Sequence, residues 1–252
     1  MTDAANTLLE ARGVSRNFGG LRAVRNVTLQ LAKGELHAVI GPNGAGKSTL
    51  VNLLSGEIPV SGGSIHLAGA DVTRLPVHRR VKQGIARSFQ RTNIFKDMSA
   101  LENVRLAAQA VHMEKGALFR ATAKATDLID RAQAALKRAG LEYFGDRIAG
   151  TLSHGAQRQL EIAMTLATSP KVLLLDEPLA GMGQEEGERI ALLLRSLAND
   201  HAVLLIEHDM DFVFRVADRM TVLVDGGVLA EGKPAEVRAS AAVQAAYLGG
   251  HA

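Results

Sequence analysis

The chain has 252 residues, of which 47% are apolar, 22% charged and 4% aromatic, with a net charge of +3 and no cysteine or tryptophan. This length suits one large α/β domain or two smaller lobes, and the composition is that of an ordinary globular protein. The lack of cysteine excludes disulfides and thiolate metal sites, while the small charge and few aromatics argue against an extended nucleic-acid-binding surface or a stacking platform for single strands.

The N-terminal part is predicted to consist mainly of strands. Its first ten residues lack the positively charged start, apolar centre and cleavage site of a secretory signal. Four apolar-rich segments broken by glycines are predicted to be strands: Leu8–Val14, Ala23–Leu31, Leu36–Ile40 and Ser64–Leu67. No run reaches the roughly 18 apolar residues that a membrane helix needs, so we expect a soluble chain whose membrane role, if any, is peripheral.

A glycine-rich segment follows the third predicted strand and matches the phosphate-loop pattern G-x-x-x-x-G-K-[ST]. Its residues are Gly41, Pro42, Asn43, Gly44, Ala45, Gly46, Lys47, Ser48 and Thr49. Because the segment joins a strand to a predicted helix, its backbone N–H groups are expected to form a concave anion site at the helix N-terminus. We expect Lys47 to reach the β- and γ-phosphates of a nucleotide and Ser48 to offer its hydroxyl to Mg²⁺.

The middle of the chain is predicted to be a mainly helical insertion. Gln90 follows the apolar stretch Ile85–Phe89, and the region from about Leu101 to Ala139 is rich in helix-forming residues and free of proline. We therefore predict a single domain over residues 1–252, with residues 8–90 and 151–252 as its core and residues 91–150 as a helical subdomain.

The C-terminal part alternates between predicted strands and helices, which indicates βαβ units and a parallel sheet. The segments are Val172–Leu175, Glu185–Leu197, Ala202–Ile206 and Met210–Ala217. Two short strands, Met220–Val224 and Val228–Ala230, follow and are joined by a sequence typical of a hairpin.

Acidic residues come directly after one of these buried strands. Asp176 and Glu177 follow Leu175, at the end of the strand where ligands bind in parallel sheets. We expect Asp176 to hold Mg²⁺ through water and Glu177 to polarise a water molecule for attack on the γ-phosphorus. His208 ends the next strand in the same way and is placed to contact the γ-phosphate. Taken alone, Asp176 and Glu177 are also typical of a solvated acidic turn after a strand. Asp209 is likewise typical of a helix cap, in which case the neighbouring His208 is incidental.

The segment Leu152–Gln157 adds an L-S-x-G element before an apolar helix. The chain carries, in this order, a phosphate loop, a lone glutamine, this element, a D-E-P strand end and a histidine. This ordered set resembles that of the ATP-binding-cassette ATPases, and the resemblance covers about residues 8–249. Finer matches resemble the ATP-binding subunits of high-affinity branched-chain amino acid importers: Ile85–Gln90, Leu160–Ala163, Ile206–Met210 and Ala246–Gly249. Urea and short-chain amide importers have similar subunits, so the solute follows only by analogy.

This resemblance implies a fold and a distribution of roles. The fold is α/β, a P-loop NTPase core with a parallel sheet, an N-terminal antiparallel β subdomain and an inserted mainly helical subdomain. Phe18 would stack on adenine from the turn after the first strand, although a core aromatic fits the sequence nearly as well. Gln90 would contact Mg²⁺ and the attacking water. Ser153 and Gly155 would cover the γ-phosphate of ATP bound to a partner subunit.

The remaining roles follow the same resemblance. Asp176 would serve Mg²⁺, Glu177 would be the catalytic base and His208 would sense the γ-phosphate. The chain differs from the usual pattern at His154 and Ala156, where the family carries glycine and a polar residue. It also has Gly183 where most members have an aspartate that links the two sites.

The resemblance also implies partners and a location. ATP hydrolysis would energise uptake through two transmembrane permease subunits, with a second ATP-binding subunit, identical or distinct, and indirectly a solute-binding protein outside the cell. The chain would lie peripherally at the cytoplasmic face of the cell membrane and bind no nucleic acid. The segment Asn93–Met98 is consistent with two roles: it forms part of a groove for a permease helix, or it is an ordinary packed loop. The basic cluster His78–Lys82 is consistent with contact to anionic lipid. The solvated side of a short helix explains it better.

Three alternatives share parts of this pattern. An ATPase of the lipopolysaccharide-export type has the same architecture, and only the finer matches separate it from an importer subunit. A soluble ATPase of DNA repair or translation usually has paired cassettes or a long coiled-coil insertion, which this short gap lacks. A nucleotide kinase would leave Leu152–Gln157 and the Asp176-Glu177 pair unexplained.

Overall fold

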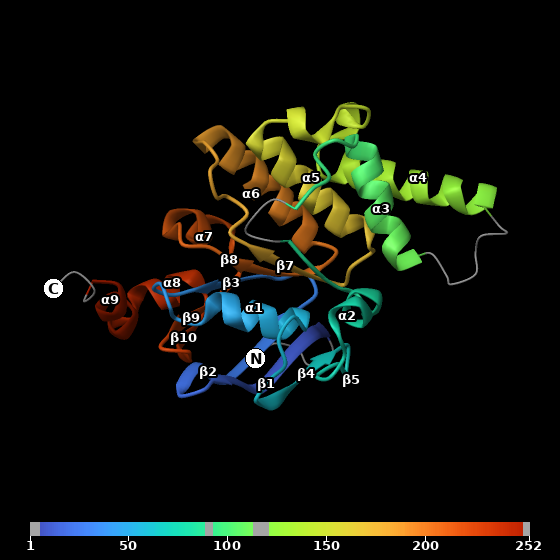
Figure 1. Ribbon diagram of the computed structural model, residues 1–252. Coiled ribbons are helices and arrows are strands. Elements are labelled where there is room, and N and C mark those ends of the chain that lie inside the picture. Colours follow the sequence, from blue (N-terminus) through green and yellow to red (C-terminus); the bar gives the residue numbers. More distant parts are fainter. Residues whose placement is uncertain (1–5, 89–92, 113–120, 249–252) are drawn as a thin grey trace.

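The computed structural model describes residues 6–88, 93–112 and 121–248 (Figure 1). Its central sheet has the strand order β10-β9-β3-β8-β7-β6, in which all neighbours run parallel except the antiparallel pair β9 and β10. The strands are β3 (Leu36–Ile40), β6 (Ile85–Arg87), β7 (Val172–Asp176), β8 (Ala202–Ile206), β9 (Arg219–Val224) and β10 (Gly227–Gly232). The expected parallel sheet and its C-terminal hairpin are therefore confirmed.

A second, antiparallel sheet is built from the N-terminal part in the order β2-β1-β4-β5. Its strands are β1 (Thr7–Phe18), β2 (Leu21–Ala32), β4 (Gly62–Leu67) and β5 (Ala70–Asp71). Strand β1 is longer than its apolar stretch predicts, because its polar end pairs with the start of β2 across a tight turn. Phe18 is consequently the last residue of β1 and not part of the turn, which corrects the expectation for its position.

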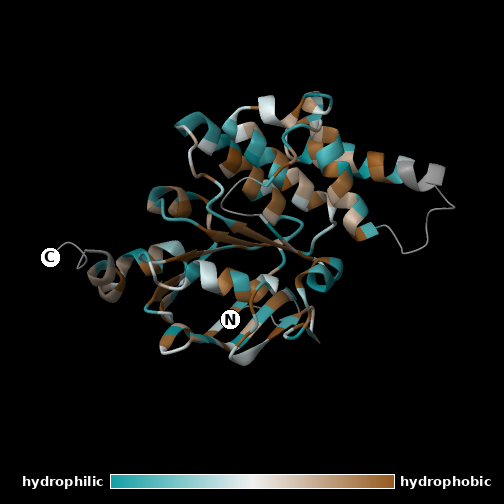
Figure 2. Cartoon of the chain, viewed as in Figure 1, coloured by the Kyte–Doolittle hydropathy of each residue, from teal (hydrophilic) through white to brown (hydrophobic). Residues whose placement is uncertain are grey.

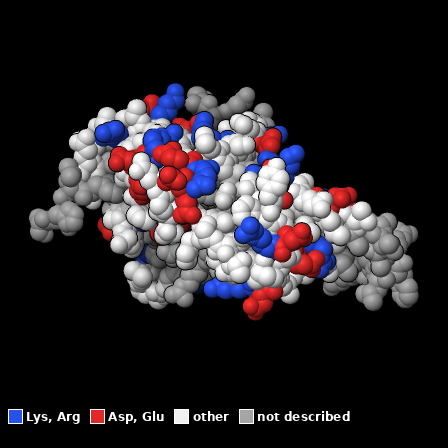
Figure 3. Space-filling view, turned by 90° about the horizontal axis from the view of Figure 1, so that it is seen from above, with Lys and Arg blue, Asp and Glu red and all other residues white. Residues whose placement is uncertain are grey.

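Helices cover the upper side of the central sheet and line its lower side (Figure 1). They are α1 (Lys47–Ser55), α2 (Val77–Gln83), α3 (Ala100–His112), α4 (Ala121–Arg138), α5 (His154–Ala167), α6 (Gln184–Ala198), α7 (Met210–Val216), α8 (Pro234–Ala239) and α9 (Ala241–Leu248). Helices α3 to α6 lie above the sheet, and α1 lies between the sheet and the antiparallel strands. In a view onto the helical side, acidic and basic side chains are intermixed across the surface (Figure 3).

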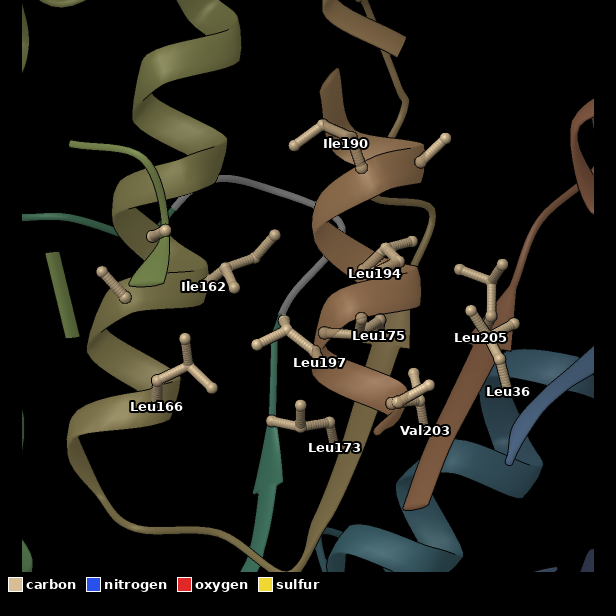
Figure 4. Close-up of a cluster of buried hydrophobic side chains, with 14 of the residues drawn as sticks. Leu36, Ile162, Leu166, Leu173, Leu175, Ile190, Leu194, Leu197, Val203 and Leu205 are labelled. Atoms are coloured by element: carbon tan, nitrogen blue, oxygen red, sulfur yellow. The ribbon is translucent and has the colours of Figure 1, made fainter. Parts of the chain in front are cut away.

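The central strands are buried on both faces, which explains their continuous apolar sequences. Leu173 and Leu175 of β7 belong to the core shared with α5 and α6 (Figure 4), whereas Val172 and Leu174 belong to the core shared with α1 and the antiparallel sheet. This alternation follows from the two-residue period of a strand. Colouring by hydropathy shows the same arrangement, with the apolar strands in the interior (Figure 2).

Arg80 is the exception in the basic cluster, whose other members His78, Arg79 and Lys82 are exposed on α2 as expected for its solvated side. Arg80 is only 1% exposed, and its guanidinium donates four hydrogen bonds to the carbonyl oxygens of Leu53, Leu54, Thr73 and Leu75. Two of these carbonyls, those of Leu53 and Leu54, belong to the last turn of α1, where helix carbonyls run out of i+4 N–H partners; Leu53 also accepts the N–H of Gly56 at 3.2 Å. Arg80 thus caps the C-terminal end of the helix that begins at the phosphate loop.

Candidate functional site

The phosphate loop joins the buried strand β3 to the N-terminus of α1. Gly46, the residue before the helix, has φ 97°, and a Cβ atom there would lie 2.4 Å from the carbonyl oxygen of Ala23. Only glycine meets both constraints. Because α1 begins at Lys47, its first N–H groups have no intrahelical partner and carry the positive end of the helix dipole. The loop therefore has the local structure of an anion site.

Lys47 lies half-buried within the loop. Its Nζ donates hydrogen bonds to the carbonyl oxygens of Gly41 at 2.6 Å and Pro42 at 3.0 Å. Burial lowers the pKa of Lys47, and the negative charges of Glu177 and Asp176 oppose this shift. The ammonium group is thus held by the loop carbonyls, close enough to the acids at the end of β7 for their charges to act on it.

A hollow, which we call the phosphate-loop hollow, opens beside these residues. It is lined by Phe18, Leu21, Arg22, Ala23, Asn43, Gly44, Ala45, Gly46, Lys47, Ser48, Thr49, Glu177, Asp225 and Gly226. Phe18 is 45% exposed, so it is not a core aromatic, and the guanidinium carbon of Arg16 lies 4.6 Å from the centre of its ring. The hairpin that joins β9 to β10 contributes Asp225 and Gly226, and Gly226 N–H donates to the carbonyl of Ala45 in the loop.

Asp176 ends strand β7 as a buried carboxylate paired with an arginine. Arg87 Nη2 lies 3.0 Å from Asp176 Oδ2, and the two side chains are only 10% and 6% exposed. Arg87 also donates to Asn52 of α1, so it connects β6, β7 and the phosphate-loop helix. Burial raises the pKa of Asp176, and Arg87 is the strongest opposing influence. Sequence reasoning did not single out Arg87, which appeared only as one letter of the stretch Ile85–Phe89.

Glu177 leaves the strand in an unusual backbone conformation. Its φ is 48°, in the left-handed region that a residue with a Cβ rarely adopts, and its N–H donates to the carbonyl of Ile206 at 2.9 Å. Strained conformations of this kind cluster at functional sites, where the surrounding structure enforces them. The turn brings Glu177 into the lining of the phosphate-loop hollow, while Asp176 stays buried beneath it.

His208 lies two residues after the end of the neighbouring strand β8 and has a largely exposed side chain. It lines a second hollow, the His208 hollow, together with the turn at residues 179–183. Preceding it, Glu207 is buried and accepts hydrogen bonds from the N–H groups of Leu179 and His208. Sequence reasoning quoted Glu207 as part of a family match but gave it no role.

Ser153 and Gly155 lie at the N-terminus of α5 and line a third hollow, the Ser153 hollow. Ser153 is the N-cap, and its Oγ accepts a hydrogen bond from the N–H of Ala156 at 3.2 Å. Glu186 of α6 lies against the same helix start, with Oε1 3.4 Å from Ser153 Oγ. A Cβ atom on Gly155 would lie 2.5 Å from that carboxylate oxygen, so a larger residue would displace Glu186.

The structure brings together only part of the expected site. Phe18, Glu177 and the loop residues from Asn43 to Thr49 share the phosphate-loop hollow, and Lys47 holds the carbonyls of Gly41 and Pro42. The Ser153 hollow and the phosphate-loop hollow share no lining residue within one chain. Gln90 lies outside the described residues.

Oxygen donors are available for a magnesium ion bound with nucleotide phosphates. The Ser48 hydroxyl belongs to the phosphate-loop hollow, and the Asp176 carboxylate lies close enough to Lys47 to influence its pKa. Hydroxyl and carboxylate oxygens suit Mg²⁺, which usually binds through one or two protein groups, phosphates and water. Over the described residues, no cluster of three or more His, Asp or Glu side chains forms a self-contained metal site.

Two family models match the chain. One, described as ABC transporter, matches residues 24–180, and the other, described as branched-chain amino acid ATP-binding cassette transporter, matches residues 228–252. The first match spans more than half of the chain and includes both the phosphate loop and the end of β7. Within residues 6–88, 93–112 and 121–248, no helix combines the length and apolar character needed to cross a bilayer.

Two curated relatives are similar over almost their whole length. The chain is 40% identical over 250 residues to the high-affinity branched-chain amino acid transport ATP-binding protein BraF of Pseudomonas aeruginosa, covering 96% of this chain and 98% of the relative. It is 40% identical over 251 residues, with the same coverage, to the corresponding protein LivG of Escherichia coli.

Solved structures agree with the fold described above. A nucleotide-free ATP-binding cassette from an ABC transporter superimposes with a TM-score of 0.85 at 29% identity, covering 96% of this chain and 98% of that one. The dimeric structure of a bacterial ABC transporter cassette gives a TM-score of 0.76 at 28% identity, covering 90% and 99%. The expected fold class is confirmed.

Proposed function

The chain is an ATPase of the ATP-binding-cassette transporter family, and from this premise we propose that it hydrolyses ATP to drive branched-chain amino acid uptake through separate permease subunits. Both cited relatives are named for high-affinity transport of these amino acids, and the C-terminal family match points to the same branch. In this proposal the chain docks peripherally at the cytoplasmic face of the membrane. A binding protein outside the cell delivers the solute to the permeases.

The phosphate-loop hollow binds the nucleotide in this proposal. Phe18 presents a ring face to adenine, while the loop N–H groups and Lys47 hold the phosphates. Ser48 and Asp176 hold Mg²⁺, which when bound neutralises charge on the β- and γ-phosphates. Gln90 completes this shell and links it to the helical subdomain.

Glu177 acts as the general base toward water. It lines the hollow next to Lys47, and its backbone is held in place by the hydrogen bond to Ile206. His208 contacts the γ-phosphate from the adjacent strand end. Phosphoryl transfer depends mainly on alignment and charge neutralisation, so these groups act chiefly by holding water and phosphate in line.

The separation of the two hollows is the observation that carries the proposal that two subunits share each ATP. Ser153 and Gly155 lie at a helix N-terminus suited to a phosphate, yet they line a different hollow from Lys47. A second ATP-binding subunit, identical or distinct, would bring its Ser153 hollow over the nucleotide of the first. Loss of the γ-phosphate would then weaken the dimer, and this difference in affinity is the energy that reaches the permeases.

The helical subdomain is proposed as the docking lobe for the two permease subunits. In this division, residues 8–90 and 151–252 form the nucleotide-binding core and residues 91–150 the lobe. Phe95 and Met98 are exposed apolar residues at the start of the lobe, which supports a contact there.

Two variants test the proposal. Lys47→Ala should abolish ATP hydrolysis, because the phosphates lose their cationic partner. Glu177→Gln should bind ATP but hydrolyse it at least a hundredfold more slowly, as is typical when a general base is removed, and should accumulate as a dimer in sizing experiments with ATP. Normal turnover by Lys47→Ala would overturn the proposed nucleotide site. A Glu177→Gln protein that stays monomeric at saturating ATP would overturn the shared site.

A further inference from the structure

Glu207 is a buried acid for which the proposed reaction has no direct use. It follows strand β8 immediately and is 1% exposed. Burial raises the pKa of Glu207, and hydrogen bonds from Leu179 and His208 oppose the rise. Because a buried carboxyl group destabilises a fold unless it is hydrogen-bonded, its contacts indicate what it does.

The two carboxylate oxygens bind two different segments of the chain. Oε1 accepts the N–H of Leu179 at 3.0 Å, and Oε2 accepts the N–H of His208 at 3.2 Å. Leu179 comes two residues after Glu177, in the turn that follows β7. One rigid, planar group therefore connects the backbone near Glu177 to the backbone of His208.

These contacts continue the pairing of β7 with β8 beyond the point where the strands end. The parallel ladder runs as far as the pair Asp176 and Ile206, and the N–H of Glu177 still donates to Ile206. At Glu177 the backbone turns into the left-handed region, so the main chains diverge and no longer pair directly. The side chain of Glu207 bridges the gap that this divergence opens.

We propose that Glu207 is a positioning residue that fixes the turn after Glu177 and the backbone of His208 relative to each other, so that both side chains reach the same γ-phosphate. This inference rests on the proposed function, in which Glu177 and His208 act on one phosphate. Glu207 is buried and both of its carboxylate oxygens accept backbone N–H groups, so it acts through its neighbours and does not touch the nucleotide.

A glutamine at this position separates hydrogen bonding from shape. Its side chain has nearly the same size as glutamate but offers one acceptor oxygen and one NH₂ donor. Its oxygen can accept the N–H of Leu179 or that of His208. The other backbone N–H then faces the NH₂ group of the glutamine, which is itself a donor and cannot accept it. Glu35 provides a matched control, because its Oε2 also accepts a backbone N–H, that of Ala32 at 3.1 Å, near the start of β3 and away from the proposed site.

The experiment compares the parent chain with Glu207→Gln and Glu35→Gln in ATP hydrolysis and in amide hydrogen exchange. For Glu207→Gln we expect kcat to fall about ten- to a hundredfold, since a misplacement of about 1 Å has this effect. We expect the KM for ATP to change less than about threefold, because Glu207 does not contact the nucleotide. Exchange at the amides of Leu179 and His208 should accelerate, whereas Glu35→Gln should leave kcat and both amides unchanged.

The outcomes separate this inference from the proposed function. A parent chain without ATPase activity would refute the proposed function, and the inference would fail with it. An active parent with an equally active Glu207→Gln variant would overturn the inference alone, as would a loss of kcat without faster exchange at Leu179 or His208. If Glu207→Gln does not fold, Glu207→Asp serves instead, because its shorter carboxylate cannot reach both N–H groups. We then expect a smaller fall in kcat with the same exchange pattern.

Discussion

Replacing Arg87 with methionine should destabilise the chain, because the carboxylate of Asp176 would lose its cation inside the protein. The pair is direct, with 3.0 Å between Nη2 and Oδ2, and neither side chain is more than 10% exposed. Methionine keeps the length and apolar part of the side chain while removing the charge, so packing changes little and the electrostatic effect dominates.

The magnitude follows from burial. Breaking a buried pair by removing one partner costs about 3–5 kcal/mol, because the remaining charge is left uncompensated. For a chain of this size, each kcal/mol lowers Tm by about 2–4 °C, which gives a fall of about 6–20 °C. Glu57 lies 3.7 Å from the same arginine but is 35% exposed, so Glu57→Gln should change stability by less than about 1 kcal/mol.

Thermal and denaturant unfolding without nucleotide would measure both variants, and the pH dependence identifies the cause. Burial already raises the pKa of Asp176 above its unfolded value, and losing Arg87 raises it further. The deficit of Arg87→Met should therefore be largest at neutral pH and shrink as falling pH protonates the carboxylate. Adding Asp176→Asn should recover most of the loss. A deficit that is independent of pH and persists in the double variant would refute this reasoning.

Three further predictions follow from other contacts. In the Glu177→Gln background, Glu186→Ala should strengthen ATP-dependent dimerisation about three- to tenfold in sedimentation experiments. The reason is that the Glu186 carboxylate, which competes with a phosphate for the N-terminus of α5, is removed. Unchanged association would contradict this. Arg80→Met should lower the free energy of unfolding by about 3 kcal/mol in denaturant titrations, because four backbone carbonyls, two of them fully buried, lose a charged donor, whereas its exposed neighbour Arg79→Met should have little effect. Because the folded-state pKa of Glu207 is raised, its ionisation destabilises the fold as pH rises above the unfolded value near 4.5; the stability advantage of the parent over Glu207→Gln should shrink with rising pH, and a growing advantage would be inconsistent with that shift.

Sequence reasoning predicted the elements whose signals are local. The phosphate loop is one continuous segment, and the strands β7 and β8 are apolar runs with distinct ends, so their place in a parallel sheet followed from alternation with helices. The fold class followed for the same reason. Strand pairing then brings Asp176, Glu177 and His208 to one edge of the sheet, because the ends of parallel neighbours coincide.

The contacts that sequence reasoning missed join segments far apart along the chain. Arg80 reads as part of a solvated basic run, yet it is buried because it meets the end of α1, 26 and 27 residues earlier. Arg87 finds Asp176 at a separation of 89 residues, and Glu207 finds Leu179 at a separation of 28. A charged residue gives no local signal of such a partner, so these roles emerge only from the folded arrangement.

In the proposed function, the charges around the phosphate-loop hollow link ATP binding to subunit association. In and beside this region, the carboxylate of Asp176 is paired with Arg87, and the negative charges of Glu177 and Asp176 oppose the lowering of the pKa of Lys47 by burial. The lining of the hollow carries two acids, Glu177 and Asp225, and two cations, Arg22 and Lys47, so a triphosphate adds negative charge that the lining side chains do not neutralise. In that proposal the balancing positive potential comes from the N-terminus of α1, a divalent cation and a second helix N-terminus, that of α5 in the partner subunit. Because the N-terminus of α5 lines another hollow within one chain, the proposal makes the negative charge of the nucleotide a driving force for bringing a partner subunit to it.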